Sequence, residues 1–386
     1  MQQNAERRKR YKENRDNLRL AGWRDANKNG ECFVRDNPNP SNMFPIFILR
    51  GPRTLFQIFN HFVTDELIRK ILSDFKDKDF ELGGTTRHGN PRLACFSISD
   101  VWQALAVQVY IVGVQKRSTE NEKNDSPLKT SIKNALLFFA NLNRTKKVIG
   151  VPKVLKLTSI INFHYYEREL CNNFQCFLCK LGDSVAGDEK LFHFTGESGN
   201  IRLVLSKPDR VGLWFYQLCC KLSCGKPYLL YARLQQVERL ESITCKEIVG
   251  EWCDVIASIG NPTNNIIDSP NKHTFLAFDS YYMSNDVRQM LSEKNINYTA
   301  SCCKTRFGPE VNALHNDTAD SPGETKTMYN ETTNEIFTYH YDTQKGVGKK
   351  YNLTRGLIRK TDKRIVRSNY DLIPGYDLYK VIFECC

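Results

Sequence analysis

The sequence predicts a mixed α/β protein, in which a helical first part precedes a part built from strands and helices. Apolar residues repeat with the spacing of one helix face in several segments between residues 46 and 180. Past Gly182 the pattern changes to short apolar runs separated by turn residues, and helical spacing returns later. Hydrophobic residues make up 41% of the 386-residue chain, enough to bury a sizeable core. Strands followed by helix, strand and helix are typical of α/β domains.

The first 45 residues are predicted to form a basic arm and linker without regular structure. Residues 1–28 hold nine basic and four acidic side chains and few apolar anchors before Trp23. The cluster Arg7–Arg10 is typical of a nuclear-import signal or a phosphate-binding patch, and a solvated basic tail fits the same composition. Residues 37–42, rich in Asn and Pro, have the composition of a linker.

Residues 46–180 are predicted to be the helical region. Thr64 is placed to cap a helix with an acidic first turn and apolar residues that include Leu67, Ile68 and Ile71. A second helix is expected after Ser99. Its apolar stripe consists of Val101, Trp102, Leu105, Ala106, Val109 and Val112. Two further helices are expected over 132–142 and 154–163.

Residues 181–386 are predicted to form the α/β part. Three short strands, expected over 201–205, 212–218 and 228–234, make a meander. Trp214 and Tyr216 in the middle strand are predicted to pack in the core rather than to stack on bases. A helix over 245–259, a strand over 274–278 and a helix over 284–294 follow.

Three aspartates lie where they could converge. Asp279 follows a buried strand directly, Asp188 lies where the helical part meets the meander, and Asp377 lies near the C-terminus. Carboxylates at strand ends meet at one edge of a sheet and can share divalent ions, which activate a water or a 3′-hydroxyl in phosphodiester chemistry. The alternative interpretation has Asp279 capping the next helix and Asp188 in a surface turn. Gly187, before Asp188, is expected to weaken a strand at this point.

Five segments around these acids occur in a fixed order: Phe62 to Leu67, Gly187 to Gly196, Ser206 to Trp214, Phe278 to Ser284 and Tyr370 to Asp377. In order, spacing and neighbours they resemble the piggyBac family of DDE transposases. The second and third segments look like the family's Asp-Glu, Phe-x-Gly and Lys-Pro-x-x-x-Gly stretch. The fourth looks like its Asp-Asn-Phe-Phe-Thr-Ser strand end. The resemblance covers roughly residues 55–386.

The resemblance implies a ribonuclease-H-like catalytic domain over 181–386, joined to a helical dimerisation and DNA-binding region over 46–180. It implies that Asp188, Asp279 and Asp377 are the catalytic residues and bind two Mg²⁺ or Mn²⁺ ions. The implied partner is double-stranded DNA, as transposon ends and TTAA targets, and the implied location is the nucleus. The resemblance is also compatible with a homodimer. Because the chain ends nine residues after Asp377, we expect it to be C-terminally truncated relative to the family.

Two basic stretches are the expected DNA contacts. Residues 345–367 carry nine positive side chains against one negative, with Tyr351 and Asn352 interleaved, and could follow a DNA backbone; a solvated loop is the alternative. The second stretch is the Lys-Pro segment. The expected DNA-binding residues are Lys207, Arg210, Lys345, Lys349, Lys350, Arg355, Arg359 and Lys360.

Three interpretations of function remain open at this stage: an active transposase, a DNA-binding derivative that has lost the reaction, and a basic intracellular interaction scaffold. No apolar run approaches the length of a membrane span, and the polar N-terminus does not resemble a secretion signal. The 14 cysteines are therefore expected to be thiols in a reducing compartment. Cys171, Cys176 and Cys179 contain one Cys-x2-Cys pair, with His164 upstream, but a structural zinc is not expected, because such a site needs a fourth ligand and usually a second pair.

Overall fold

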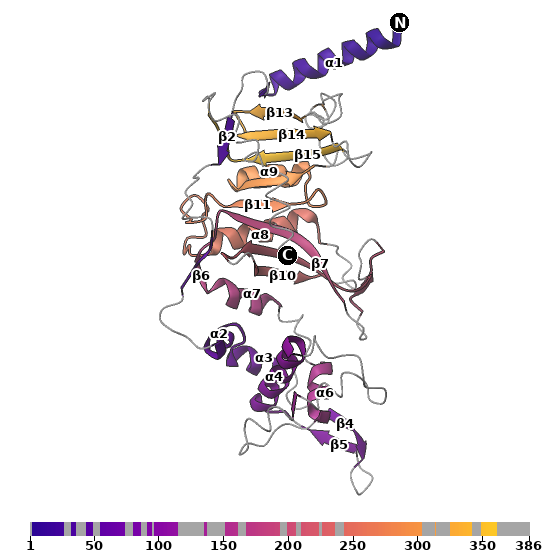
Figure 1. Ribbon diagram of the computed structural model, residues 1–386, viewed down its shortest axis with the longest axis vertical. Helices are drawn as coiled ribbons and strands as arrows, with labels where there is room; N and C mark the ends of the chain where they lie inside the picture. The colour runs from indigo at the N-terminus through magenta and orange to yellow at the C-terminus, as the bar shows by residue number, and fades with distance from the viewer. Residues whose placement is uncertain are drawn as a thin grey trace. The chain divides into compact units, whose positions relative to one another are not determined.

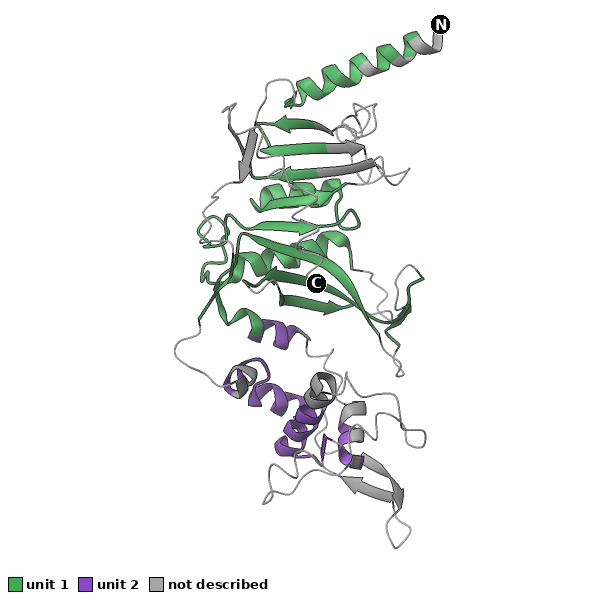
Figure 2. Cartoon of the chain, viewed as in Figure 1, with its two compact units in different colours: residues 1–50, 174–386 green, residues 51–173 purple. Residues whose placement is uncertain are grey.

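The computed structural model describes residues 2–26, 32–35, 44–48, 55–73, 80–85, 91–94, 96–114, 135–136, 151–160, 167–193, 199–205, 210–223, 226–235, 243–302, 313, 325–341 and 349–360. The chain divides into two compact units, shown in Figure 2. One, which we call the sheet unit, consists of residues 1–50 and 174–386. The other, the helical unit, consists of residues 51–173 and overlaps the helical region predicted over 46–180.

The helical unit has one apolar cluster, to which helices α3 (Asp65–Ser73), α4 (Ile98–Val114) and α6 (Val151–Ile160) contribute. Helix α2 (Leu55–Phe62) precedes α3, and α7 (Glu167–Gln175) contains residues of both units. Strands β4 (Phe80–Thr85) and β5 (Pro91–Ala94) form an antiparallel hairpin that the helical spacing did not predict. Of the helix predicted over 132–142, only residues 135–136 lie within the described part, and they are helical.

The predicted start of α3 is confirmed, and the predicted face of α4 is partly wrong. Thr64 Oγ1 accepts a hydrogen bond from the Leu67 backbone N–H at 3.1 Å, which satisfies one of the free donors of the first turn. In α4, Ala106 is exposed and Val107 is fully buried. The stripe is displaced because Trp102 lies at the rim of the cluster, where its indole N–H donates to Asp65 Oδ1 at 2.9 Å.

The main feature of the sheet unit is a ten-stranded sheet in the order β1-β13-β14-β15-β12-β11-β7-β9-β10, with β8 also paired to β9 (Figure 1). Strand β7 (Ser184–His193) is parallel to β11 (Phe275–Phe278), and β11 is parallel to β12 (Asn297–Ser301). The three predicted strands are confirmed as β8 (Ile201–Leu203), β9 (Val211–Lys221) and β10 (Pro227–Leu234), but the predicted meander is wrong. β8 and β10 pair antiparallel with successive parts of β9, residues 211–213 and 215–221. Strand β7 itself pairs antiparallel with β9.

Beyond β12 the sheet continues with strands that the sequence did not predict. Antiparallel pairing joins β12 to β15 (Lys349–Arg355), then β14 (Glu335–Tyr341) and β13 (Thr325–Asn330). Two small sheets pair β16 (Leu357–Lys360) with β2 (Cys32–Arg35), and β3 (Ile46–Phe47) with β6 (Leu178–Lys180).

The N-terminal segment differs from the arm predicted over 1–45. Residues Gln2–Leu20 form helix α1, and β1 (Trp23–Asp25) is an edge strand that pairs antiparallel with β13. Trp23 is fully buried in the core of the sheet unit. Asn330 Nδ2 donates to the Ala21 carbonyl at 2.8 Å and helps to hold the turn between α1 and β1. The prediction of an unstructured arm rested on high charge and low apolar content within the segment. It is wrong because the segment is anchored by Trp23, which is buried by residues distant in the sequence.

Helices α8 (Cys245–Ser258) and α9 (Asn285–Glu293) link the strands, as predicted. Thr244 and Glu247 form a capping box at the start of α8, and Ser284 Oγ accepts from the Val287 N–H at the start of α9. Trp252 of α8 is fully buried in the same apolar cluster as residues of β7, β9 and β11. None of the described helices is both long and apolar enough to cross a membrane.

A buried ion pair ties α9 to the extended part of the sheet. Arg288 donates from Nε to Glu335 Oε1 at 2.8 Å and from one Nη to Oε2 at 2.5 Å, and the Tyr298 hydroxyl donates to Oε1 at 2.6 Å. Burial by itself raises the pKa of Glu335, but the hydrogen bonds and charge of Arg288 outweigh it and hold that pKa below its usual value. Glu335 is therefore a buried carboxylate whose negative charge is balanced by Arg288.

Candidate active site: two carboxylates on neighbouring parallel strands

The register of β7 and β11 brings Asp188 and Asp279 together. Phe278, the last residue of β11, is aligned with Gly187 in β7, so that Asp279 and Asp188 are the next residues on two neighbouring parallel strands. This register places the two residues side by side, and the charge of the Asp279 carboxylate contributes to the raised pKa of Asp188. The structure therefore unites two of the three predicted carboxylates. Asp377 lies outside the described residues.

Asp188 is not in a surface turn, and Asp279 does not cap a helix. Asp188 lies within β7, opposite Gln217 of β9, and the helix after Asp279 is capped by Ser284. The Asp279 side chain instead accepts a hydrogen bond from the Tyr281 N–H at 2.7 Å, which fixes the turn that leaves β11. Both alternative interpretations are therefore wrong.

The electrostatics of Asp188 favour a cation. Burial, the neighbouring carboxylate of Glu189 and the charge of Asp279 raise the pKa of Asp188 from 3.8 to about 8. Its Oδ1 accepts a hydrogen bond from the Glu189 N–H at 2.8 Å, which opposes the rise only in part. Crowded carboxylates repel one another unless they are protonated or share a cation, so this pair fits a divalent metal ion.

Glu189 and Tyr282 connect β7, in which Asp188 lies, to the segment after β11, in which Asp279 lies. The Tyr282 hydroxyl donates to Glu189 Oε2 at 2.9 Å, and the Tyr282 ring is fully buried, 4.8 Å from Trp252 between ring centroids. Burial, followed by the carboxylates of Glu189, Asp188 and Asp279, raises the pKa of Tyr282, so that its hydroxyl remains a donor. Neither residue was predicted as part of the site. Their positions, one residue after Asp188 and three after Asp279, are the only signal that could have identified them.

Gly187 does not weaken the site, as the sequence suggested, but makes its packing possible. A Cβ atom at Gly187 would overlap the six-membered ring of Trp252. The absence of a side chain therefore allows α8 to pack directly on β7, next to Asp188. A glycine in a strand can mark such a close approach.

The remaining predicted residues are only partly described. Arg210 is exposed at the start of β9, whereas Lys207 and Lys345 lie outside the described residues. Lys349 and Lys350 are in β15, and Arg359 and Lys360 are in β16. Arg355 is engaged within the fold, since its two Nη atoms donate to the Ile296 carbonyl at 3.1 Å and to Asn295 Oδ1 at 3.0 Å.

The cysteines considered as zinc ligands are not grouped into a metal centre among the described residues. Cys171 is buried, Cys176 is exposed and Cys179 Sγ donates to the Ile46 carbonyl at 3.2 Å, while His164 lies outside the described residues. Across the described residues, no three or more His, Cys, Asp or Glu side chains are arranged to hold a metal ion. Cys219 and Cys220 are buried in β9, and Tyr216 is buried as predicted.

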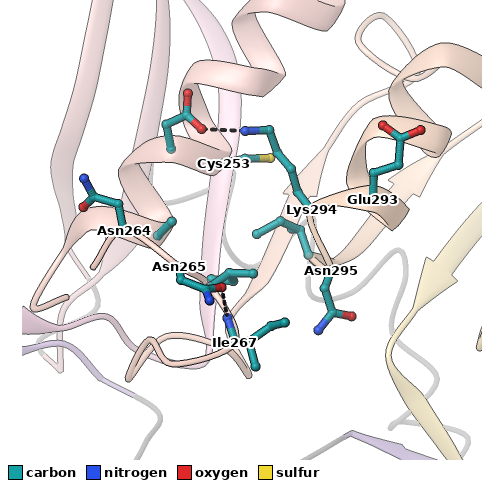
Figure 3. A pocket seen from close by; sticks show the side chains of 11 residues that line it. Cys253, Asn264, Asn265, Ile267, Glu293, Lys294 and Asn295 are labelled. Carbon is teal, nitrogen blue, oxygen red and sulfur yellow. Dashed lines mark hydrogen bonds and ion pairs between the residues drawn. The ribbon is translucent and has the colours of Figure 1, made fainter. Parts of the chain in front are cut away.

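A pocket of about 230 Å³ lies apart from the two carboxylates (Figure 3). It is lined by the ends of α8 and α9 and by residues 264–267. Because α9 leads from the end of β11 back to the start of β12, this pocket is at the opposite edge of the sheet from Asp279. The ion pair of Lys294 Nζ with Asp254 Oδ1, 2.7 Å, neutralises charge in its wall. It contains none of the predicted site residues.

The fold and this pair of carboxylates define a mixed α/β protein with an acidic site between parallel strands. No protein-family model and no curated protein matches the sequence. Among solved structures, the chain is similar in fold to piggyBac transposase, seen by cryo-EM in a synaptic complex with hairpin DNA. The TM-score is 0.52 with 12% sequence identity, over 87% of this chain and 69% of the other. The chain therefore shares the fold of piggyBac transposase, as the sequence motifs predicted.

Proposed function

We propose that the protein is a piggyBac-like transposase, or a protein derived from one, that binds double-stranded DNA and cleaves and joins its strands in a metal-dependent reaction. The observation that carries the proposal is the placement of Asp188 and Asp279 on neighbouring parallel strands. The strand order β10-β9-β7-β11-β12 supports it, because this order, with β9 antiparallel and β11 and β12 parallel to β7, is that of ribonuclease-H-like domains. The fold shared with piggyBac transposase supports it further.

Asp188 and Asp279, completed by Asp377, would hold two Mg²⁺ or Mn²⁺ ions. Ions bound there would activate a water or a 3′-hydroxyl and stabilise the leaving oxygen. The chain's own contribution is to set the positions of the carboxylates. Glu189 and Tyr282 fix β7 against the turn after β11, and the Tyr281 N–H orients Asp279. Burial of Asp188 in a water-poor position strengthens its interaction with a cation.

The proposed substrates are transposon ends and TTAA target sites in double-stranded DNA. Support comes from charge, since the chain carries a formal net charge of +12, and phosphate contacts dominate the affinity of proteins for DNA. We also propose a nuclear location, because α1 carries the basic cluster Arg7–Arg10, in which Arg8, Lys9 and Arg10 are exposed. A fluorescent fusion that stays in the cytoplasm would contradict the nuclear location.

A nicking assay on labelled transposon-end DNA tests the proposal. The full chain should give nicked product with Mg²⁺ and none with EDTA, and Asp279→Ala should abolish the product. Asp286→Asn is the matched control, because Asp286 is an exposed carboxylate in the first turn of α9. Salt-sensitive binding without product would identify a DNA-binding derivative that has lost the reaction. No salt-sensitive binding to duplex DNA would leave the interaction scaffold as the remaining interpretation.

A further inference from the structure

Arg202 has a buried nitrogen without a hydrogen-bond partner. It lies in β8 opposite Gly212 of β9, and its Nε is inaccessible to solvent and unpaired. A guanidinium is always charged and presents its donors in a planar fork that matches carboxylate and phosphate groups. A buried N–H donor without an acceptor is unfavourable, so Nε of this half-buried, positively charged side chain favours an anionic ligand.

The charge of Arg202 acts on Tyr216, which is aligned with Glu189 across β9 and β7. Burial, followed by the neighbouring Tyr281, raises the pKa of Tyr216, and the charge of Arg202 opposes that rise. Tyr216 and Tyr282 meet edge to face, with ring centroids 6.2 Å apart, and Tyr282 donates to Glu189. Arg202 is thus connected through Tyr216 to the turn that follows Asp279.

Tyr281 presents an exposed ring at the same place. It is 42% exposed, although its backbone is held on both sides: its N–H donates to Asp279 Oδ1 at 2.7 Å, and its carbonyl accepts from Cys245 Sγ at 3.4 Å. Its ring stands perpendicular to that of Tyr282, with centroids 5.1 Å apart. A large aromatic ring that is fixed and yet open to solvent is suited to stacking.

We propose that Arg202 and Tyr281 form a subsite for one nucleotide of a DNA strand, in which Arg202 binds the phosphate and Tyr281 stacks on the base. The proposal rests on the proposed DNA-binding function and assigns it a specific place beside Asp279. Bases stacked inside a duplex do not offer their faces to a side chain, so the nucleotide is at a strand end or unpaired. The subsite would hold the end of the strand next to the two carboxylates.

Stacking is tested with short single strands in which 2-aminopurine replaces one base at a time, bound to the full chain in Ca²⁺. Stacking on an aromatic ring quenches 2-aminopurine, so quenching should occur at one position in the wild type. Tyr281→Ala should remove the quenching and lower the affinity about tenfold, whereas Tyr281→Phe should keep both. Quenching that survives in Tyr281→Ala, or that occurs at no position although the strand binds, overturns the role of Tyr281.

The phosphate contact is tested with Arg202→Gln. One lost phosphate contact should weaken binding of the strand and lower the slope of log affinity against log salt by about 0.7. Arg202→Lys keeps the charge and should retain part of the affinity. Lys226→Gln is the matched control, because Lys226 is exposed directly before β10, and it should bind as the wild type does. Equal binding by Arg202→Gln and Lys226→Gln overturns the role of Arg202.

Two further outcomes separate this subsite from its alternatives. A deoxynucleoside monophosphate alone should not compete with the strand at comparable concentration. If it binds saturably and loses binding in Arg202→Gln, the site takes free nucleotides and the assignment to a strand is wrong. If the wild type binds neither single strands nor duplex DNA, the proposed DNA-binding function fails and the subsite fails with it. If the wild type binds duplex DNA, but Tyr281→Ala and Arg202→Gln bind single strands as the wild type does, the subsite alone is overturned.

Discussion

Replacing Asp188 by Asn should stabilise the metal-free protein and remove its response to divalent ions. Asn keeps the size of the side chain and an oxygen that can accept from the Glu189 N–H, but it carries no charge. In the wild type, burial and the neighbouring carboxylates raise the pKa of Asp188 from 3.8 to about 8. Folding near neutral pH therefore forces this carboxyl to take up a proton or to remain charged among other carboxylates.

The size of the effect follows from this difference in pKa. For a carboxyl that is protonated only in the folded state, linkage gives a cost of about 4 kcal/mol at pH 7. This is an upper limit, because the side chain can rotate toward water, and we expect on the order of 1–3 kcal/mol. The sign is that of a raised pKa: stability is fully present below pH 3.8 and is lost as the pH rises toward about 8. Asp188→Asn lacks this loss.

Thermal unfolding measured from pH 4 to pH 9, in EDTA and in Mn²⁺, gives the test. In EDTA, the difference in stability between Asp188→Asn and the wild type should grow with pH and level off above about pH 8. Mn²⁺ should stabilise the wild type, most strongly at high pH, and should leave the variant unchanged. A variant less stable than the wild type in EDTA at pH 8 would refute the electrostatic reasoning. So would a wild-type stability that does not fall relative to the variant over this range.

Three further predictions concern packing and capping. Gly187→Ala should destabilise the protein by about 1–3 kcal/mol in urea unfolding, because the new methyl group overlaps Trp252. Gly250→Ala in α8 is the control and should stabilise by about 0.5–1 kcal/mol, since its Cβ meets only Met290 Sδ at 3.5 Å. Glu335→Gln should cost about 3–5 kcal/mol by leaving Arg288 unneutralised. Because the pKa of Glu335 is lowered in the folded protein, its contribution to stability is present above its unfolded pKa and is lost as the pH falls. Unfolding measured from pH 3 to pH 6 should show this loss of stability in the wild type and not in Glu335→Gln. Thr64→Ala should cost about 1 kcal/mol by thermal unfolding, and Thr64→Ser should restore most of it.

Local signals in the sequence determined several elements correctly. Helix α3 follows from its cap Thr64 and its acidic first turn, and the helix predicted over 284–294 corresponds to α9. Strand β11 was identified as an apolar run that ends on Asp279. These signals work because caps and periodic apolar faces act within a few residues of one another. The order of the acidic motifs also predicted the fold that the chain shares with piggyBac transposase.

The tertiary structure decided what lies next to the two carboxylates. Whether Asp188 meets Asp279 depends on the register of β7 against β11, and a shift of one residue would turn one of them to the other face. The need for Gly187 depends on Trp252, and the paired N-terminal strand depends on the burial of Trp23. Each of these contacts joins residues far apart in the chain. The sequence therefore pointed to Asp188 and Asp279 as candidate residues. Only packing between distant segments placed them side by side and determined their neighbours.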